Sequence, residues 1–126
     1  GVNVRIIIPA RSDSLLVHWA TCSFVDGLLS AGVKVYLYTA GFLHSKLIAV
    51  DGRMASVGTA NMDIRSLEDN SEVSTFIYDR ATVTELTATL EDYIAHSRRV
   101  MPDEWYSRPH GQRFVEAIAR LVSPLF

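Results

Sequence analysis

Residues 43–72 read LHSKLIAVDGRMASVGTANMDIRSLEDNSE, and the rest of the chain is best interpreted outward from them. The run Leu43–Val50 is mostly apolar or β-branched and is closed by Asp51-Gly52, which predicts a strand entering a tight hairpin turn. Side chains alternate between the two faces of a strand. His44 and Lys46 are therefore expected to point to the same face.

The same alternation sends Asp51 to the opposite face, where we expect it to satisfy backbone donors of the turn. A two-residue loop would also fix the pairing of the hairpin, whereas a loop longer by one residue would shift it. The two-residue loop predicts three cross-strand pairs: Val50 with Arg53, Lys46 with Val57, and His44 with Thr59. In that register Thr59 stands beside His44.

These residue types suit phosphoryl transfer. An imidazole such as that of His44 can act as nucleophile or proton donor, while Lys46 supplies positive charge to a phosphate oxygen. Thr59 and Asn61 add neutral hydrogen-bond donors, and a carboxylate such as Glu72 could accept the other ring N–H of the histidine. One histidine and one lysine make a poor metal-ligand set, so we expect neither a metal nor another cofactor.

The spacing HxKxxxxD, followed by Gly-Thr, Asn61 and Glu72, resembles the phospholipase D superfamily. The longer run GFLHSKLIAVDGRMASVGTANMDIRS is similar to the C-terminal catalytic half of bacterial cardiolipin synthases. The segments VNVRIIIPARSDS, GVKVYLY, FIYDR and RLVSPLF extend the resemblance over essentially the whole chain. One departure is the run NSEVS at residues 70–74, where the family often reads Asn-Phe-Glu-Val-Asn.

The resemblance implies an α/β fold with a mixed, largely parallel sheet flanked by helices, and one catalytic half domain over residues 1–126. Family members carry two such motifs, and the first usually supplies the nucleophile. His44 would then be general acid and later base, Lys46 and Asn61 would bind phosphate, and Glu72 would orient the histidine. Thr59 occupies a position that is often serine.

The implied reaction transfers a phosphatidyl group between two phosphatidylglycerol molecules through a phosphohistidine, giving cardiolipin and glycerol. The implied partners are the phospholipid, a membrane surface, and a complementary N-terminal half or a second copy of the chain. The implied location is the bacterial inner membrane, reached through segments missing from this chain.

Two other functions stay open. One is a homodimeric phosphodiesterase or nuclease of the same superfamily, whose site is built by twofold symmetry. The other is an isolated half domain that is inactive by itself. The net charge of -2 gives no general attraction to nucleic acid, which is not expected as a partner.

Composition and length fit one globular domain, with 126 residues, 48% of them apolar and 21% charged. The single cysteine, Cys22, excludes an internal disulfide and is expected to be a buried packing residue. No segment reaches the roughly 18 apolar residues that a membrane span needs.

The elements before the motif predict a parallel βαβ unit. Its strands are expected at Val4–Ile8 and Val33–Tyr38, joined by a helix that is capped by Ser12 or Asp13 and runs to Ala31. No chemistry is expected of His18 in that helix.

After the motif, a strand is expected over Glu72–Tyr78, and helices over Ala81–His96 and Gln112–Val122. The last helix is expected to turn its apolar residues inward: Phe114, Val115, Ile118, Leu121 and Val122. Arg65 and Ser66, in the loop between strands, are interpreted as scaffolding rather than phosphate ligands.

Overall fold

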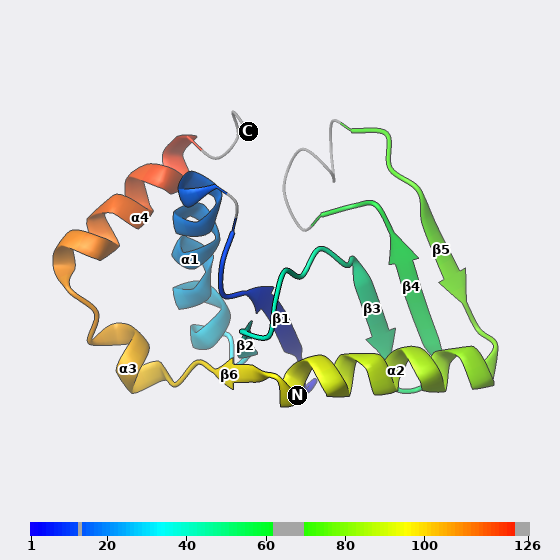
Figure 1. Ribbon diagram of the computed structural model, residues 1–126. Coiled ribbons are helices and arrows are strands. Elements are labelled where there is room, and N and C mark those ends of the chain that lie inside the picture. Colours follow the sequence, from blue (N-terminus) through cyan, green and yellow to red (C-terminus); the bar gives the residue numbers. More distant parts are fainter. Residues whose placement is uncertain (13, 62–69, 123–126) are drawn as a thin grey trace. The chain divides into compact units, whose positions relative to one another are not determined.

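The computed structural model describes residues 1–12, 14–61 and 70–122 (Figure 1). The chain divides into two compact units. Unit 1 comprises Gly1–Leu43 and His96–Phe126, and unit 2 comprises His44–Ala95. Both combine helices with strands, which confirms the predicted α/β class. None of the helices among the described residues is long and apolar enough to cross a lipid bilayer.

Unit 1 contains the predicted βαβ unit. Strand β1 (Arg5–Pro9) and strand β2 (Lys34–Tyr38) pair in parallel and are joined by helix α1 (Leu15–Ser30). The helix begins after Ser14, later than predicted, and ends before Gly32, whose positive φ of 80° suits a glycine. A short strand that the sequence pattern did not indicate, β6 (Ser97–Arg99), pairs antiparallel with β2, giving the order β1-β2-β6.

One face of this sheet carries the core of unit 1. A short helix, α3 (Pro102–Tyr106), lies in a segment for which the sequence pattern predicted no helix or strand. Apolar residues of α1, β2 and α3, with the residue after β6, form one buried cluster: Cys22, Val25, Val35, Val100 and Trp105. The predicted burial of the cysteine is confirmed.

Helix α4 (His110–Val122) is held to α1 by charged groups. The guanidinium of Arg108 donates to both carboxylate oxygens of Glu116, at 2.8 and 3.0 Å, and to Asp26 on α1 at 3.2 Å. It also lies 3.5 Å from the ring centre of Trp105, whose indole N–H donates to the same Asp26 at 2.6 Å. The network satisfies the buried carboxylate of Glu116, which is otherwise costly to remove from water.

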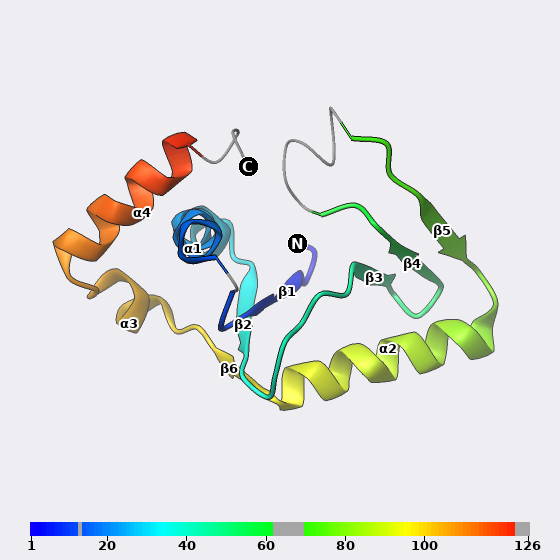
Figure 2. The ribbon, with the colours of Figure 1, turned by 45° about the horizontal axis from the view of Figure 1, so that its top comes forward.

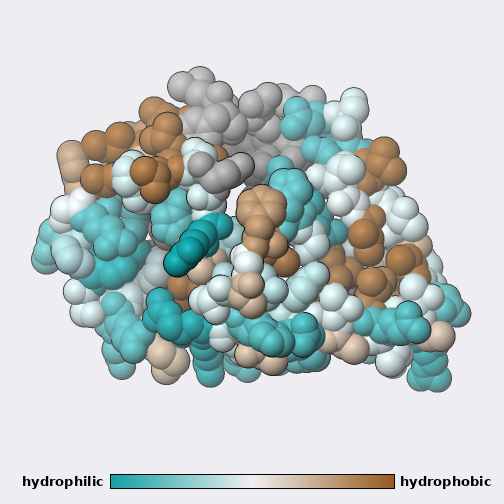
Figure 3. All heavy atoms as spheres, viewed as in Figure 1, coloured by the Kyte–Doolittle hydropathy of each residue, from teal (hydrophilic) through white to brown (hydrophobic). Residues whose placement is uncertain are grey.

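The predicted inward face of α4 is therefore wrong. Glu116 is only 3% exposed and Ala119 is buried, whereas Leu121 is 81% exposed. Exposure is also substantial at three further apolar positions of the predicted face: Phe114, Val115 and Ile118. The helix packs through its polar and small residues because Arg108 and Asp26 supply partners for them. Part of the apolar surface over α4 is visible in Figure 3.

Unit 2 is an antiparallel sheet covered by one helix. Strands β3 (Leu47–Val50), β4 (Met54–Gly58) and β5 (Ser74–Ile77) pair in the order β3-β4-β5. Helix α2 (Arg80–Ala95) runs beside β3 and β4, as Figures 1 and 2 both show. Val83 of this helix is fully buried, as the helical spacing predicted.

Helix α2 begins at a capping aspartate. The carboxylate of Asp79 accepts from the backbone N–H of Thr82 at 2.9 Å and from its hydroxyl at 2.7 Å, and the Asp79 carbonyl accepts the first helical bond, from Val83. The hydrogen bond from the Thr82 backbone N–H lowers the pKa of the Asp79 carboxyl. The bond from the Thr82 hydroxyl lowers it further, by a smaller amount.

The pairing of strands differs in detail from the largely parallel sheet that was expected. Among the described residues, the parallel pair is β1 with β2, and the strands form two three-stranded sheets, one mixed and one antiparallel. Parallel neighbours require a crossover connection. The α1 crossover supplies one for β1 and β2, whereas β3 and β4 are joined by a short turn that can only make an antiparallel pair.

Candidate functional site

All six candidate residues lie in unit 2. His44 and Lys46 precede β3 rather than lying within it, so the strand is shorter than predicted. The ammonium of Lys46 donates to the carbonyl oxygen of His44 at 3.0 Å, and the Lys46 carbonyl accepts from the backbone N–H of Gly58 at 3.1 Å. Antiparallel pairing thus continues past the strand end as far as the lysine and holds the HxK segment against β4.

The predicted turn is present, but the predicted register is wrong by one residue. Asp51 and Gly52 have positive φ angles of 50° and 62°, and the N–H of Arg53 donates to the carbonyl of Val50 at 2.9 Å. These are features of a two-residue type I′ turn. Arg53, however, is an extra residue between turn and ladder, so Val50 pairs with Met54.

The shift changes which residues of β4 lie opposite the HxK motif. Leu47, not Lys46, pairs with Val57, and the lysine lies opposite Gly58. The ladder therefore does not pair His44 with Thr59. Asp51 lies in the exposed turn, in a left-handed conformation that aspartate tolerates better than most residues.

The two faces of strand β3 differ in burial, although Ser56, the β4 partner of Ile48, is only 8% exposed. Ala55 is fully buried on the face that α2 covers, together with Val83 of that helix. Ile48 and Val50 lie on the other face and are 53% and 42% exposed. The alternation predicted from the sequence thus applies within β3.

Thr59 and Glu72 are brought together at the other end of β4. The Thr59 hydroxyl donates to Glu72 Oε2 and accepts from the backbone N–H of Val73 at 3.0 Å. The Thr59 N–H donates in turn to the Val73 carbonyl at 3.0 Å. The sequence marked both residues as candidates but did not predict this bond.

Asn61 is exposed and follows the end of β4 by three positions. The loop after it includes Arg65 and Ser66, both of which lie outside the described residues. Within the residues that are described, no group of three or more His, Cys, Asp or Glu side chains gathers as metal ligands would.

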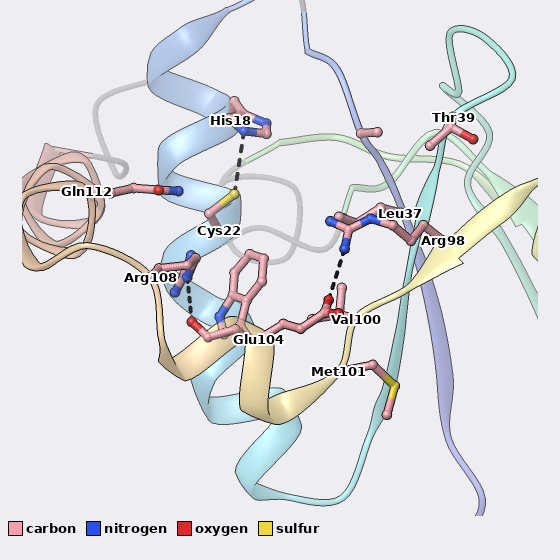
Figure 4. A pocket seen from close by; sticks show the side chains of 12 residues that line it. His18, Cys22, Leu37, Thr39, Arg98, Val100, Met101, Glu104, Arg108 and Gln112 are labelled. Carbon is pink, nitrogen blue, oxygen red and sulfur yellow. Dashed lines mark hydrogen bonds and ion pairs between the residues drawn. The ribbon is translucent and has the colours of Figure 1, made fainter.

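A cavity of about 370 Å³ lies within unit 1, and none of the candidate residues lines it. Figure 4 shows His18 and Cys22 of α1 beside it, with Arg98 and Glu104 across from them. His18 Nε2 is 3.7 Å from the Cys22 sulfur, and the two charged residues form an ion pair at 3.3 Å. Burial, aided by the negative charge of Glu116, raises the pKa of the Cys22 thiol to about 11. This cysteine is protonated at neutral pH and is a packing residue.

The sequence did not point to Arg108 and Trp105, which organise unit 1. The available signal was a tryptophan with Asp, Glu and Arg residues close to it in the sequence, between two predicted helices. Their bonds to Asp26 and Glu116 are structural, since they hold α3 and α4 on α1.

Comparison with known proteins places the chain in a family. The family described as "Cardiolipin synthase, PLD-like domain" matches residues 1–94. Similar curated proteins include cardiolipin synthase 1 of Staphylococcus aureus (strain COL), 45% identical over 125 residues, and the major cardiolipin synthase ClsA of Bacillus subtilis (strain 168), 44% identical over 125 residues. Cardiolipin synthase A of Pectobacterium carotovorum is 46% identical over the same length.

Each of these alignments covers 99% of this chain but only 25–26% of the relative. The chain thus spans about a quarter of the length of the curated relatives that it matches. No solved structure matches it significantly. On the family match and on these identities, the chain belongs to the phospholipase D-like domain family of the cardiolipin synthases.

Proposed function

We propose that this chain supplies one half of a phosphatidyl-transfer site, with His44 as its proton-transfer group. The substrates are two phosphatidylglycerol molecules and the products are cardiolipin and glycerol. The family and the names of the relatives support the lipid reaction, and the residue types of the HxK segment support transfer at a phosphodiester.

The reaction proceeds in two steps. A histidine of the complementary motif attacks phosphorus, so a P–N bond forms while the P–O bond to glycerol breaks, and His44 donates its proton to the departing glycerol oxygen. In the second step His44 takes the proton from a hydroxyl of the second phosphatidylglycerol, whose oxygen displaces the histidine from phosphorus. Lys46 and Asn61 bind the phosphate oxygens, and Glu72 accepts the other ring N–H of His44.

One observation carries the proposal: hydrogen bonds of the β3-β4-β5 sheet join the motif segments within one compact unit. The Lys46 carbonyl pairs with Gly58, and the adjoining Thr59 is bonded to Glu72. Residues up to 26 positions apart in the sequence are thereby tied to a single strand, β4. A site built on paired strands holds its groups more firmly than one built on free loops.

The proposed site needs a second motif, because one HxK segment offers a single histidine for two roles. The partner is a complementary half that carries its own motif, or a second copy of this chain related by a twofold axis. Residues 1–126 would act as one catalytic half domain, at a membrane that holds the lipid substrate.

The first experiment asks whether the chain works with its own copies. Purified chain is incubated with phosphatidylglycerol in mixed micelles, and the lipids are separated and identified by mass spectrometry. Cardiolipin formed by the chain but not by His44→Ala would mean that two copies make a working site. Salt-sensitive cleavage of DNA without lipid transfer would favour the nuclease instead.

The second experiment supplies the partner half. This chain replaces the matching 125 residues of the Staphylococcus aureus cardiolipin synthase 1, and the chimera is assayed with the same lipid. We expect His44→Ala to lower kcat by about 10²–10⁴-fold, the usual contribution of a positioned acid or base. Lys46→Ala should cost about 10²–10³-fold through lost charge stabilisation.

Matched controls come from the other histidines. His18→Ala and His110→Ala in the same chimera are expected to retain activity, since both lie in unit 1 and outside the HxK segment. Loss of activity in either control equal to that of His44→Ala would refute the assignment of His44.

A further inference from the structure

The hydroxyl of Thr59 is already engaged by other protein groups. It has a single proton, which it donates to Glu72 Oε2, and its oxygen accepts from the N–H of Val73 at 3.0 Å. The Thr59 backbone N–H donates to the Val73 carbonyl, also at 3.0 Å. Three hydrogen bonds thus fasten this one residue to the segment that leads into β5. A hydroxyl that donates to a carboxylate cannot donate the same proton to a phosphate.

The glycine before it is what lets the two strands come this close. Gly58 pairs with Ser74 at the end of the β4–β5 ladder. A Cβ atom on Gly58 would lie 2.5 Å from Ser74 Oγ and 2.6 Å from the carbonyl oxygen of Val73. The serine side chain can rotate away, but the Val73 carbonyl is backbone and accepts from Thr59. Any larger residue at position 58 would push the start of β5 away from Thr59.

We propose that Gly58 and Thr59 form a clamp that positions the carboxylate of Glu72. The glycine allows the close approach of the two chain segments, and the threonine donates to one carboxylate oxygen, which fixes the carboxylate for its bond to the histidine. Thr59 is therefore a positioning residue and does not contact the lipid phosphate. The part of this inference that concerns the histidine rests on the function proposed above.

The clamp gives the Gly-Thr dipeptide a physical role that its sequence alone did not reveal. Thr59 was first interpreted as a neutral donor for phosphate beside His44, in a register that the structure shifts by one residue. In the observed register its partner is the acidic residue 13 positions downstream. A charged acceptor strengthens such a hydrogen bond, and a hydroxyl fixed by a second bond to the backbone has little freedom to turn away.

The hydrogen bond is tested on the purified chain by carbon NMR of the Glu72 carboxyl during a pH titration. Thr59→Val removes the hydroxyl at nearly constant shape, and Thr59→Ser retains it. Loss of the donor destabilises the carboxylate, so Thr59→Val should raise the pKa of Glu72, while Thr59→Ser leaves it near the wild-type value. Equal titration of all three proteins would overturn the clamp, whatever the chain's activity.

The consequence for catalysis is tested in the chimeric synthase. Thr59→Val should lower kcat by about tenfold with KM nearly unchanged, Thr59→Ser should restore it, and Thr59→Val should add no further loss to Glu72→Gln. A raised KM at unchanged kcat would instead place the hydroxyl on the lipid and overturn the inference, as would a full loss in Thr59→Ser.

The two proposals fail in different ways. An inactive chimera with His44 intact would count against phosphatidyl transfer, and the NMR titration would then decide the clamp alone. Gly58→Ala provides a second variant: it should raise the pKa of Glu72 in the same direction as Thr59→Val, with the fold checked by circular dichroism. An unchanged titration in Gly58→Ala would contradict the role of the glycine.

Discussion

Helices α2 and α4 are both amphipathic, yet they bury opposite kinds of face. Helix α2 packs an apolar side chain, Val83, against the unit 2 sheet. Helix α4 turns the buried Glu116 toward α1 and leaves Leu121 to solvent. Helical spacing identifies the apolar stripe of a helix, but the surface that the helix meets decides which face is buried. Where Arg108 and Asp26 offer charged partners, the polar face packs inside.

The largest expected effect comes from removing the charge that holds α4. Arg108→Ala leaves Glu116 buried and without the guanidinium that donates to both of its carboxylate oxygens, which typically costs about 3–5 kcal/mol. The measurement is the free energy of unfolding of the purified chain in urea.

Another arginine of unit 1 provides the control. Arg98 pairs with Glu104, but both side chains are more than half exposed, so Arg98→Ala should cost no more than about 1 kcal/mol. If the two variants lost equal stability, the network around Arg108 would not be what holds α4 in place.

The next prediction compares the loss of stability when an apolar side chain is shortened to alanine on each helix. Val83→Ala removes two fully buried methyl groups and should cost about 2 kcal/mol, from lost burial and the cavity left behind. Leu121→Ala, on the exposed stripe of α4, should change stability by no more than about 0.5 kcal/mol. Urea unfolding of both variants measures the contrast, and a larger loss at Leu121 would show that the apolar face of α4 is covered in solution.

The smallest effect concerns the aspartate that caps the start of α2. The folded-state pKa of Asp79 is lowered from its usual 3.8, so its carboxylate stabilises the fold above that pH. This stabilisation is lost as the pH falls through the lowered folded-state value. Asp79→Ala should therefore reduce the melting temperature at pH 7, by less than Val83→Ala does, and the difference should vanish in strong acid.

A matched variant separates charge from capping. Asn is as good an N-cap as Asp but does not titrate, so Asp79→Asn should melt near the wild-type temperature at pH 7. Its stability should also lack the acid-dependent loss that the wild type shows. If Asp79→Asn followed the pH dependence of the wild type, another carboxyl would be responsible.

Much of the fold could be predicted from local patterns in the sequence. The parallel pair of β1 and β2 was predicted from two β-branched runs separated by a helix, and α2 was placed to within a residue at each end. Strand β6 and helix α3 were missed because they are too short to show a period. The buried face of α4 was missed because the partner of Glu116 is an arginine eight residues before it, outside the helix.

The site was predicted in composition but not in geometry. The motif identified His44, Lys46, Thr59 and Glu72 as a set. Their contacts depend on register, and the insertion of Arg53 between turn and ladder shifts every cross-strand pair by one. The sequence predicted the turn at Asp51-Gly52. The same sequence fits a loop of two residues or of three, and only the observed pairing of β3 with β4 shows which loop length is present.

The pairing of β2 with β6 has a consequence for how the chain folds. Thr39 and His96, at the joined ends of these strands, are 57 residues apart and are linked by two hydrogen bonds. All of unit 2 lies between them, as an insertion within what is otherwise a hairpin. Closing a flexible loop of that length costs about 3–4 kcal/mol of chain entropy. If unit 2 folds first, it shortens the effective loop, so the order of assembly should run from the segment that carries the HxK motif to the β1-β2-β6 sheet of unit 1.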